Sequence, residues 1–439
     1  MPSDSRIRWT YQSIATLPLI NIIMCIRPTK VSPVGKGSAH NLQGREFEPR
    51  CRCEDLVVKD VLRSKCVCKN WKSLICEPQF CYEHTLRLCR KYKQNPNPNP
   101  YPYPSGILLQ RYIGSLLPKK ADIIPFTNNN SNSNKRFAHL HHAYNKLDEL
   151  RHYQIQQSCN GLLLWQSTPQ FVLYPPYDAG TKEVLHQGCS FYVSNPTTGH
   201  YVPIDQFGHE FHRIFSRPFL VFEPWKSPHY KIIFFTKVEG DRKKLTTKMK
   251  MSVYSSATKS WSRVDLLPSF PNSNLDYGVY CNGAIHWYAV GKYSMYFDID
   301  RLCLKNLPTL ELPGARMIDL EVVYFGECGG NLHLIVARID EKLRYDILEL
   351  KEDYSEWMVR YYIDLSTIES RNSTVFGVSC VVRQPPKEDE NEESKLAIVS
   401  VDYEKLVAYN LKDHSSRIFY EGGFVPYIQH QYFETLAGM

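Results

Sequence analysis

Two hydrophobic patterns divide this chain. From Glu54 to Leu88, apolar residues recur at helical steps, and neither Pro nor Gly interrupts them before Pro78. That spacing predicts two or three short helices. From about residue 105 onward the chain consists of many short runs rich in Val, Ile, Tyr, Phe and Trp, separated by Gly, Pro, Asn, Asp and Ser. Such runs are typical of an all-β sandwich or propeller.

The second half of the chain repeats two short elements. In the first element, a tight turn leads into an apolar strand, at residues 158–161, 280–283 and 327–330. Each of these turns contains Gly where positive φ is needed. The second element is strand, polar turn and strand, which predicts a hairpin; it begins at Phe191, Ser252, Tyr296, Tyr345 and Leu406. Successive hairpins recur at intervals of about 45 to 60 residues, the period of a four-stranded propeller blade.

Residues 105–435 are therefore predicted to form one β-propeller-like domain of six or seven blades. Ahead of it, residues 94–104 hold five prolines at alternate positions, which predicts an extended spacer. Residues 51–93 form the predicted helical module, and residues 1–50 are basic and lack clear periodicity. The expected fold class is α+β and multidomain, with a short N-terminal helical module followed by a large all-β propeller-like domain.

Composition and charge narrow the classes of partner. The chain has 439 residues, of which 43% are hydrophobic and 22% charged, as in ordinary globular proteins. No stretch approaches the ~20 apolar residues that span a bilayer, so we expect no membrane partner. Residues 1–93 hold 17 Lys and Arg against 8 Asp and Glu. These cations are scattered among apolar residues, which favours a solvated face over a nucleic-acid site.

Cysteine use points to an intracellular protein with reduced thiols. Seven of the 14 cysteines lie between Cys51 and Cys89, and the others are spread singly inside apolar runs. Zinc binding by the cluster is the alternative, but its spacing gives Cys-x-Cys and never Cys-x-x-Cys. We therefore expect no metal and no other cofactor. Reduced thiols fit the cytoplasm, the nucleus or both.

Motifs for catalysis are missing from the chain. It contains no Gly-x-Ser-x-Gly, His-Glu-x-x-His, Gly-x-Gly-x-x-Gly or P-loop sequence. A glycosidase or lyase with two acids in a propeller channel is the enzymatic alternative, and the sequence offers no such pair. We expect a protein that is not an enzyme.

Two groups of motifs resemble a known family. Residues 53–58 (CEDLVV), 61–75 (VLRSKCVCKNWKSLI) and 77–80 (EPQF) resemble the two ends of an F-box. SCNGLLLW, SNPTTGHY, VYSSATKSW, NGAIHWY and ECGGNLHLI resemble the kelch-like, F-box-associated propeller domain of plant F-box proteins. The resemblance covers about residues 54–88 and 155–425. It implies that the helical module binds a Skp-type adaptor through Leu56, Val57, Val61, Leu62, Val67, Trp71 and Leu74.

The F-box itself is truncated. Arg52 and Cys53 stand where the family has Leu-Pro, and only two residues separate Val58 from Val61, a loss of about eight residues. The missing Leu and Pro side chains would help to fill the adaptor's apolar cleft, so we expect adaptor binding to be weakened.

The resemblance implies a substrate-recognition subunit of an SCF-type (Skp–cullin–F-box) ubiquitin ligase, which presents bound proteins for ubiquitination. The alternative is a non-catalytic propeller scaffold that has lost adaptor binding. The target protein itself is unknown. Loop aromatics and cations are common anchors at a target-binding face, and the predicted ones are Arg213, Arg217, Trp225 and Lys226.

Overall fold

The computed structural model describes residues 58, 61–62, 65–66, 69–91, 102–113, 117–126, 153–167, 190–204, 217–237, 246–265, 267–271, 275, 277–289, 294–312, 314, 319–338, 341–368, 376–386, 393–402, 404–421 and 429–436. The chain forms two compact units, residues 1–80 and 81–439. Residues 1–50, and with them the prediction made for that segment, lie outside the described residues.

Two helices follow the predicted helical pattern. Helix α4 covers Lys69–Ile75, and helix α5 covers Pro78–Lys91. Pro78 occupies the first position of α5, where its missing N–H costs no helical hydrogen bond. Ile75 and Phe80 are buried. The second compact unit begins at Cys81, inside α5, whereas the sequence pattern predicted a boundary at residues 94–104. That boundary stays a prediction.

The β-domain is built from six antiparallel sheets, each called a blade here. Blade 1 contains β24 (Gln429–Tyr432), β1 (Gly106–Ile113) and β2 (Leu117–Pro125). Blade 2 contains β3 (Tyr153–Cys159), β4 (Leu162–Ser167), β5 (Phe191–Asn195) and β6 (His200–Ile204). Blade 3 contains β7 (Phe219–Val221), β8 (Lys231–Lys237), β9 (Thr246–Ser255) and β10 (Ser260–Val264), with β11 (Ser269–Pro271) paired to β9.

The remaining three blades have four strands each. Blade 4 contains β12 (Val279–Cys281), β13 (Ala284–Trp287), β14 (Met295–Asp298) and β15 (Cys303–Asn306). Blade 5 contains β16 (Leu320–Cys328), β17 (Asn331–Arg338), β18 (Glu341–Leu350) and β19 (Trp357–Asp364), followed by the short helix η6 (Leu365–Thr367). Blade 6 contains β20 (Phe376–Gln384), β21 (Ser394–Val401), β22 (Lys405–Asn410) and β23 (Ser416–Glu421).

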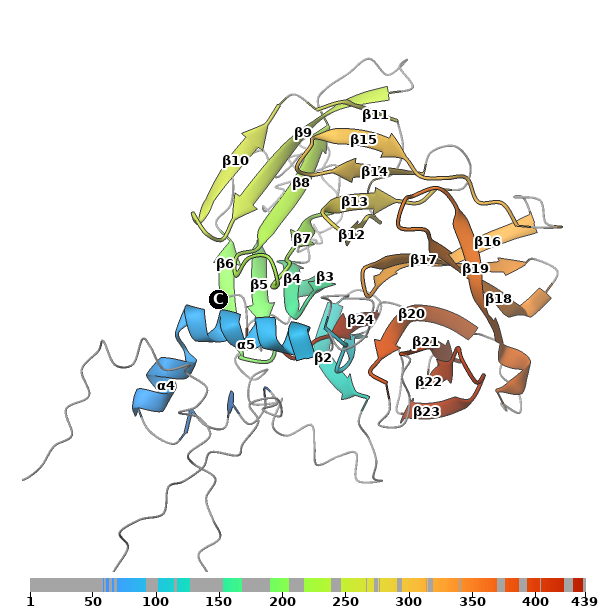
Figure 1. Cartoon of the computed structure of the whole chain (residues 1–439), viewed down its shortest axis with the longest axis horizontal. Coiled ribbons are helices and arrows are strands. Elements are labelled where there is room, and N and C mark those ends of the chain that lie inside the picture. The colour runs from blue at the N-terminus through green and yellow to red at the C-terminus, as the bar shows by residue number, and fades with distance from the viewer. Residues whose placement is uncertain are drawn as a thin grey trace, which may run out of the picture. The chain divides into compact units, whose positions relative to one another are not determined.

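The six blades close into a ring. One edge strand of each blade, called its inner strand here, contacts the inner strands of the two neighbouring blades, in the circular order β3, β7, β12, β16, β20, β24 and back to β3. The ring closes because the last strand of the chain, β24, pairs with β1 and completes blade 1. Figure 1 shows the blades around this centre, with the C-terminal strand β24 in red in the same blade as the cyan strand β2. The predicted propeller is therefore confirmed, with six blades.

Apolar side chains fill the interfaces between the blades. Separate buried clusters join blades 1 and 2, blades 4 and 5, blades 5 and 6, and blades 6 and 1. The largest cluster joins blades 2, 3 and 4 and is rich in aromatic rings. In it, the Trp287 ring packs edge-on against Phe219 and Phe235, with centroids 5.7 and 5.6 Å apart. Since neighbouring blades share these clusters, burial of apolar surface stabilises the ring as a whole.

The repeated elements of the sequence fold as predicted. The five strand–turn–strand repeats are the third and fourth strands of blades 2 to 6, and the three Gly turns join the first two strands of blades 2, 4 and 5. At the turn centres φ is positive for both residues, for example 48° at Asn282 and 81° at Gly283. Two such residues in sequence match the twist of a two-residue hairpin.

The thiols of the inner strands are buried and free. Cys159, Cys281, Cys328 and Cys380 are all free and buried, as expected from their apolar surroundings. In two of the Gly turns, the Cys and the following Asn bind a backbone carbonyl of the next blade. The Cys281 thiol and the Asn282 amide donate to the Gly330 carbonyl oxygen, at 3.3 and 2.8 Å. The turn therefore fixes one blade to the next as well as reversing the chain.

Candidate functional site

A cavity of about 200 Å³ lies among the inner strands at the centre of the ring. Its walls come from β3, β12, β16, β20 and β24, with residues just beyond their ends, so five of the six blades contribute. Ligand sites in propellers and barrels favour such a position, because a rigid ring holds the wall residues in place. The cavity is the candidate site of this protein.

Polar side chains join the inner strands around the cavity. The amide of Gln157 spans from β3 to β7, where it accepts from the Leu220 N–H at 2.7 Å and donates to the Leu220 carbonyl at 3.2 Å. The Gln431 amide on β24 donates to the carbonyls of Glu327 and Val381, at 3.0 and 3.2 Å. These bonds replace the backbone ladder that neighbouring blades lack.

Two irregular residues of the inner strands reach the same cavity. The register of β3 shifts between Ile155 and Gln157, and that of β20 shifts between Val378 and Cys380. The extra residues are therefore Gln156 and Ser379, and both line the cavity. A β-bulge places a side chain differently from the regular alternation. The bulges thus add an amide and a hydroxyl to the wall.

His430 contributes the wall's imidazole. It lies on β24, and its Nε2 atom is buried without a hydrogen-bond partner among the described residues. Burial lowers the pKa of His430 to about 4, although a hydrogen bond with the Ile155 backbone opposes this, and the charge of Arg217 lowers it further. The ring is therefore neutral at pH 7. Arg217 itself stacks on Tyr277, its Cζ atom 4.9 Å from the ring centroid, and Tyr277 is 70% exposed.

Glu327 is the one carboxylate among the described residues of the cavity wall. Its Oε1 atom accepts from the Gly330 N–H at 2.6 Å within its own turn. Burial raises the pKa of Glu327, while the backbone hydrogen bond and the charge of Arg383 act in the opposite direction. A glycosidase of the usual kind needs two carboxyl groups facing one bond. The described wall does not supply such a pair.

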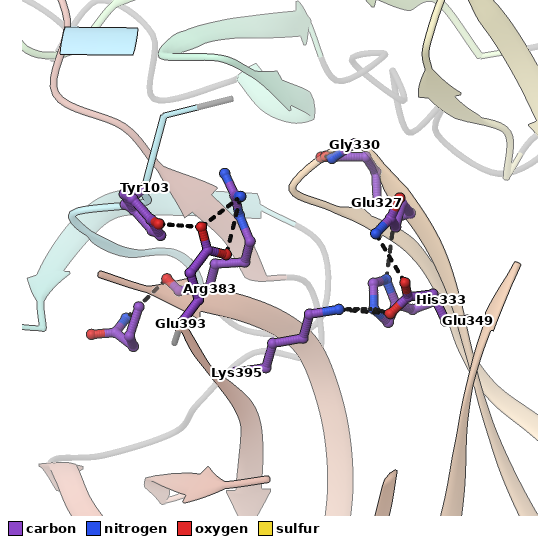
Figure 2. Close-up of polar contacts among 10 residues, drawn as sticks. Tyr103, Glu327, Gly330, His333, Glu349, Arg383, Glu393 and Lys395 are labelled. Atoms are coloured by element: carbon purple, nitrogen blue, oxygen red, sulfur yellow. Dashed lines mark hydrogen bonds and ion pairs between the residues drawn. The ribbon is translucent and has the colours of Figure 1, made fainter. Parts of the chain in front are cut away.

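Paired charges surround the Glu327 turn (Figure 2). Lys395 Nζ donates to Glu349 Oε2 at 2.7 Å and lies 3.0 Å from His333 Nε2. Burial alone would raise the pKa of Glu349, but its contacts with His333 and Lys395 outweigh it and lower the pKa to about 2. His333 Nδ1 lies 3.1 Å from the Asn331 carbonyl oxygen, and burial lowers the pKa of His333. His333 Nε2 also lies 3.3 Å from Glu349 Oε2, so the imidazole, the ammonium and the carboxylate meet at one point.

The second charged pair connects the end of the predicted spacer to blade 6. Arg383 Nη1 lies 3.3 Å from Glu393 Oε2, and its Cζ atom is 4.8 Å from the centroid of the Tyr103 ring. The Tyr103 hydroxyl donates to Glu393, and Figure 2 shows the three side chains together. A Cβ atom added at Gly329 would lie 2.1 Å from Arg383 Nε, so only glycine leaves room for this arginine. These charged pairs lie outside the cavity wall. Among the described residues, the wall itself contains uncharged side chains and Glu327.

Three of the four predicted target-binding residues are described, and they flank strand β7 in the chain. Arg217 precedes β7, at the end where its charge reaches His430. Trp225 and Lys226 follow β7, beyond its other end, and are half-buried and exposed, respectively. Lys226 pairs with Glu223 at 2.9 Å. Arg213 lies outside the described residues. None of the three described residues lines the cavity, and target binding by any of the four stays a prediction.

The predicted adaptor-binding residues are only partly visible. Leu56, Val57 and Val67 lie outside the described residues, and the side chains of Trp71 and Leu74 on α4 are not described. Val61 is fully buried, and Leu62 is half-buried. Because Val61 is buried, any contact of its side chain with an adaptor requires it to become exposed.

The described residues show neither a candidate metal site nor a helix that could span a membrane. Within these ranges no group of three or more His, Cys, Asp and Glu is placed to hold a metal ion. Of the cysteine cluster, Cys66 and Cys76 are exposed and Cys81 is half-buried. Among the described helices, none has the length and apolar character needed to cross a membrane.

The sequence did not indicate His430, Gln156 or Ser379 as site residues. The role of His430 depends on the closure of β24 against β1, and those of Gln156 and Ser379 depend on register shifts. A polar residue in an otherwise apolar strand is a weak signal of a ligand site, because Gln157 and Gln431 on the inner strands bind the backbone of neighbouring blades instead.

Comparison with known proteins supports the fold and the family. Residues 116–303 match the F-box associated beta propeller domain. F-box protein At5g07610 of Arabidopsis thaliana is 27% identical over 329 residues, which cover 71% of this chain and 68% of the relative.

Similar solved structures are more distant. They include the GH43 BlXynB protein from Bacillus licheniformis, at 8% identity and a TM-score of 0.31, and the Mitotic Checkpoint Complex, at 7% identity and a TM-score of 0.25. The matched regions cover 64% and 52% of this chain. The chain spans 58% of the length of the first and 70% of the second. The family resemblance found in the sequence is therefore confirmed: the six-bladed domain is similar to the F-box associated beta propeller domain over residues 116–303, and the chain is similar to an F-box protein of a plant.

Proposed function

We propose that this protein is a substrate-recognition subunit of an SCF-type ubiquitin ligase. The observation that carries the proposal is the match of residues 116–303 to the F-box associated beta propeller domain, joined to a helical stretch that resembles an F-box. In this role the helical module binds a Skp-type adaptor and the propeller binds a target protein, in the cytoplasm or the nucleus. The chain is then a binding subunit without catalysis of its own.

The propeller is suited to the recognition half of this role. Its ring is closed by β24 and by shared apolar clusters, so its faces are rigid supports for recognition loops. The cavity at the centre adds a small polar recess. A rigid receptor loses little conformational entropy on binding, which favours affinity.

The adaptor half of the role is weakened in this chain. The Leu-Pro opening and about eight further residues of the F-box are missing, and Arg52 and Cys53 stand in place of the opening. Central interface residues typically contribute about 2 kcal/mol or more each. The loss of two such residues weakens binding roughly a thousandfold, at about 1.4 kcal/mol per factor of ten.

The second candidate is a scaffold that has kept the propeller and lost the ligase contact. The truncation that weakens adaptor binding is the observation that favours it. The two functions differ in one property, since a scaffold binds its target without recruiting an adaptor.

A titration of purified Skp-type adaptor with the full chain distinguishes the two candidates. The matched variant restores the Leu-Pro opening and the eight or so missing residues. We expect weak binding by the natural chain and binding about a thousandfold tighter by the restored variant. Tight binding by the natural chain would show that the truncation is harmless, and failure of both would favour the scaffold.

A further inference from the structure

Two residues from neighbouring blades form an exposed pair beside the starts of their inner strands. Arg217 lies two residues before β7 and Tyr277 two residues before β12, and these two strands are adjacent in the ring. The Arg217 Cζ atom lies 4.9 Å from the centroid of the Tyr277 ring. Tyr277 is 70% exposed, more than any other large hydrophobic side chain among the described residues. The pair is called the Arg217–Tyr277 platform here.

The backbone on both sides of Tyr277 is held by the core. Leu275 is 1% exposed, and its carbonyl accepts from Trp287 Nε1 at 3.0 Å. A Cβ atom added at Gly278 would lie 2.6 Å from the side chains of both Phe219 and Trp287, so glycine lets the backbone approach these rings closely. An aromatic residue on a backbone that is already fixed loses little conformational entropy on binding. Tyr and Arg are also enriched among the residues that anchor interfaces.

The charge of Arg217 has no carboxylate partner among the described residues. Arg383, by contrast, pairs with Glu393 at 3.3 Å in addition to its contact with a tyrosine ring. A guanidinium has five N–H donors, and contact with an aromatic ring does not use them up. Arg217 therefore keeps donors for a ligand.

This charge defines the chemistry of a partner. A guanidinium binds a carboxylate through two parallel hydrogen bonds, and because Arg217 is half-buried, solvent screens the pair less than at a fully exposed site. Arg217 is the one charged group among the described residues that acts on the pKa of His430, so one guanidinium supplies the positive potential there. Phosphate sites usually use several arginines, whereas one guanidinium matches the single charge of a carboxylate. The exposed Tyr277 ring adds apolar surface beside it.

We propose that the Arg217–Tyr277 platform binds an acidic segment of the target protein, in which an Asp or Glu side chain pairs with Arg217 and a neighbouring apolar side chain packs on Tyr277. The proposal rests on the proposed function of the propeller as the target-binding domain, and it names the chemical class of the segment. Of the four target-binding residues predicted from the sequence, it selects Arg217, and it adds Tyr277, which the sequence did not indicate.

Four capped pentapeptides test the charge of the segment. Each has the form acetyl-Gly-Leu-Xaa-Leu-Gly-N-methylamide, with Glu, Gln, Lys or phosphoserine as Xaa, and its binding to the full chain is measured by saturation-transfer NMR of the peptide. We expect the Glu peptide to bind with a dissociation constant on the order of 1 mM, and the Gln and Lys peptides to bind at least tenfold more weakly. Absence of binding by the Glu peptide, or equal binding by Glu and Gln, would overturn the proposal. Phosphoserine binding more than tenfold tighter than Glu would overturn it in favour of a phosphorylated segment.

Three variants assign the binding to the platform. Arg217→Gln should weaken binding of the Glu peptide at least tenfold, and Arg217→Lys, which keeps the charge without the planar fork, should recover only part of it. Tyr277→Ser should weaken the binding at least threefold through loss of the apolar contact. Arg360→Gln removes an exposed charge from the outer strand β19 and should bind as the natural chain does.

The outcome of these variants is decisive even if one of them unfolds. A thermal melt checks each fold, and Tyr277→Ser provides the test if Arg217→Gln is unfolded, because Tyr277 is mostly exposed. Equal losses in Arg217→Gln and Arg360→Gln would show an effect of net charge alone and contradict the proposal. Unchanged binding by the folded Tyr277→Ser variant would also contradict it.

A last variant tests whether the chain supplies its own carboxylate. Asp276 precedes Tyr277 in the sequence and lies outside the described residues. Asp276→Asn should bind the Glu peptide within threefold of the natural chain, and a larger gain would show that Arg217 is already occupied and overturn the proposal. The adaptor titration is independent, because a chain that binds the adaptor and none of the peptides would leave the ligase role standing.

Discussion

At the scale of single residues, the buried charges beside the cavity are paired with one another, whereas the polar side chains of the cavity wall are mostly uncharged. Lys395, Glu349 and His333 satisfy one another beside the Glu327 turn, and Arg383 is covered by Tyr103 and Glu393. The bulge residues Gln156 and Ser379 belong to the cavity wall.

Removal of one partner from the Lys395–Glu349 pair should be costly. Both side chains are mostly buried, at 13% and 15% exposed. Lys395→Met leaves a buried carboxylate without its cation, and the expected loss of stability is about 3 kcal/mol. The matched double variant, Lys395→Met with Glu349→Gln, should recover more than half of that loss. Urea unfolding measures both, and equal losses in the two variants would show that the charges do not interact.

His286 makes the fold sensitive to acid. The unfolded chain binds a proton on this ring near pH 6.5, whereas burial lowers the pKa in the folded state to about 4. The folded state therefore binds fewer protons between these values, and its stability falls as the pH drops from 6.5 to 4. The loss is at most about 3 kcal/mol. In His286→Phe the curve of stability against pH should be flatter, though lower at pH 7, and an unchanged slope would contradict the assignment. Replacement of the exposed His229 by Gln is the control.

At the scale of elements, the hairpin turns do two tasks. The turn Asn282-Gly283 reverses the chain with positive φ, and the Asn282 amide binds the next blade. Asn282→Ala loses both the tolerance of this conformation and the hydrogen bond, and should cost about 2 kcal/mol. Asn282→Gly keeps the conformation and should cost about 1 kcal/mol. Thermal unfolding compares the two variants, and equal losses would mean that the backbone conformation contributes nothing.

The hairpins and turns of the propeller could be predicted from the sequence, whereas its β-bulges could not. Five outer hairpins and three Gly turns were predictable, because their signals lie within a few neighbouring residues. The bulges at Gln156 and Ser379 were not, since a register shift depends on the partner strand and on the packing of the next blade. Residues Leu56 and Val57 of the helical module lie outside the described ranges, so their predicted contacts stay predictions.

At the scale of the whole molecule, the spacer of residues 94–104 is the predicted boundary between the two modules. Its Pro-rich sequence predicts an extended, cleavable segment, but Tyr103 is bound to blade 6, and Thr85 on α5 lies 3.1 Å from Thr435, between their hydroxyl oxygens. We expect limited proteolysis to cut before Tyr103 and to release an intact β-domain, whose unfolding temperature falls only by the loss of the contact between Thr85 and Thr435. If the cut chain instead unfolds as one piece, as judged by calorimetry, the two modules depend on each other.

The measurement that tests the central claim most directly is recovery of the ligase from plant cells that express the full chain. Three versions are compared: the natural chain, the chain with the restored F-box residues, and a chain that lacks residues 51–93. Adaptor and cullin peptides in the purified material are quantified by mass spectrometry. The ligase role predicts both proteins with the restored chain, smaller amounts with the natural chain and none with the deletion. Absence of adaptor and cullin from all three versions would contradict it.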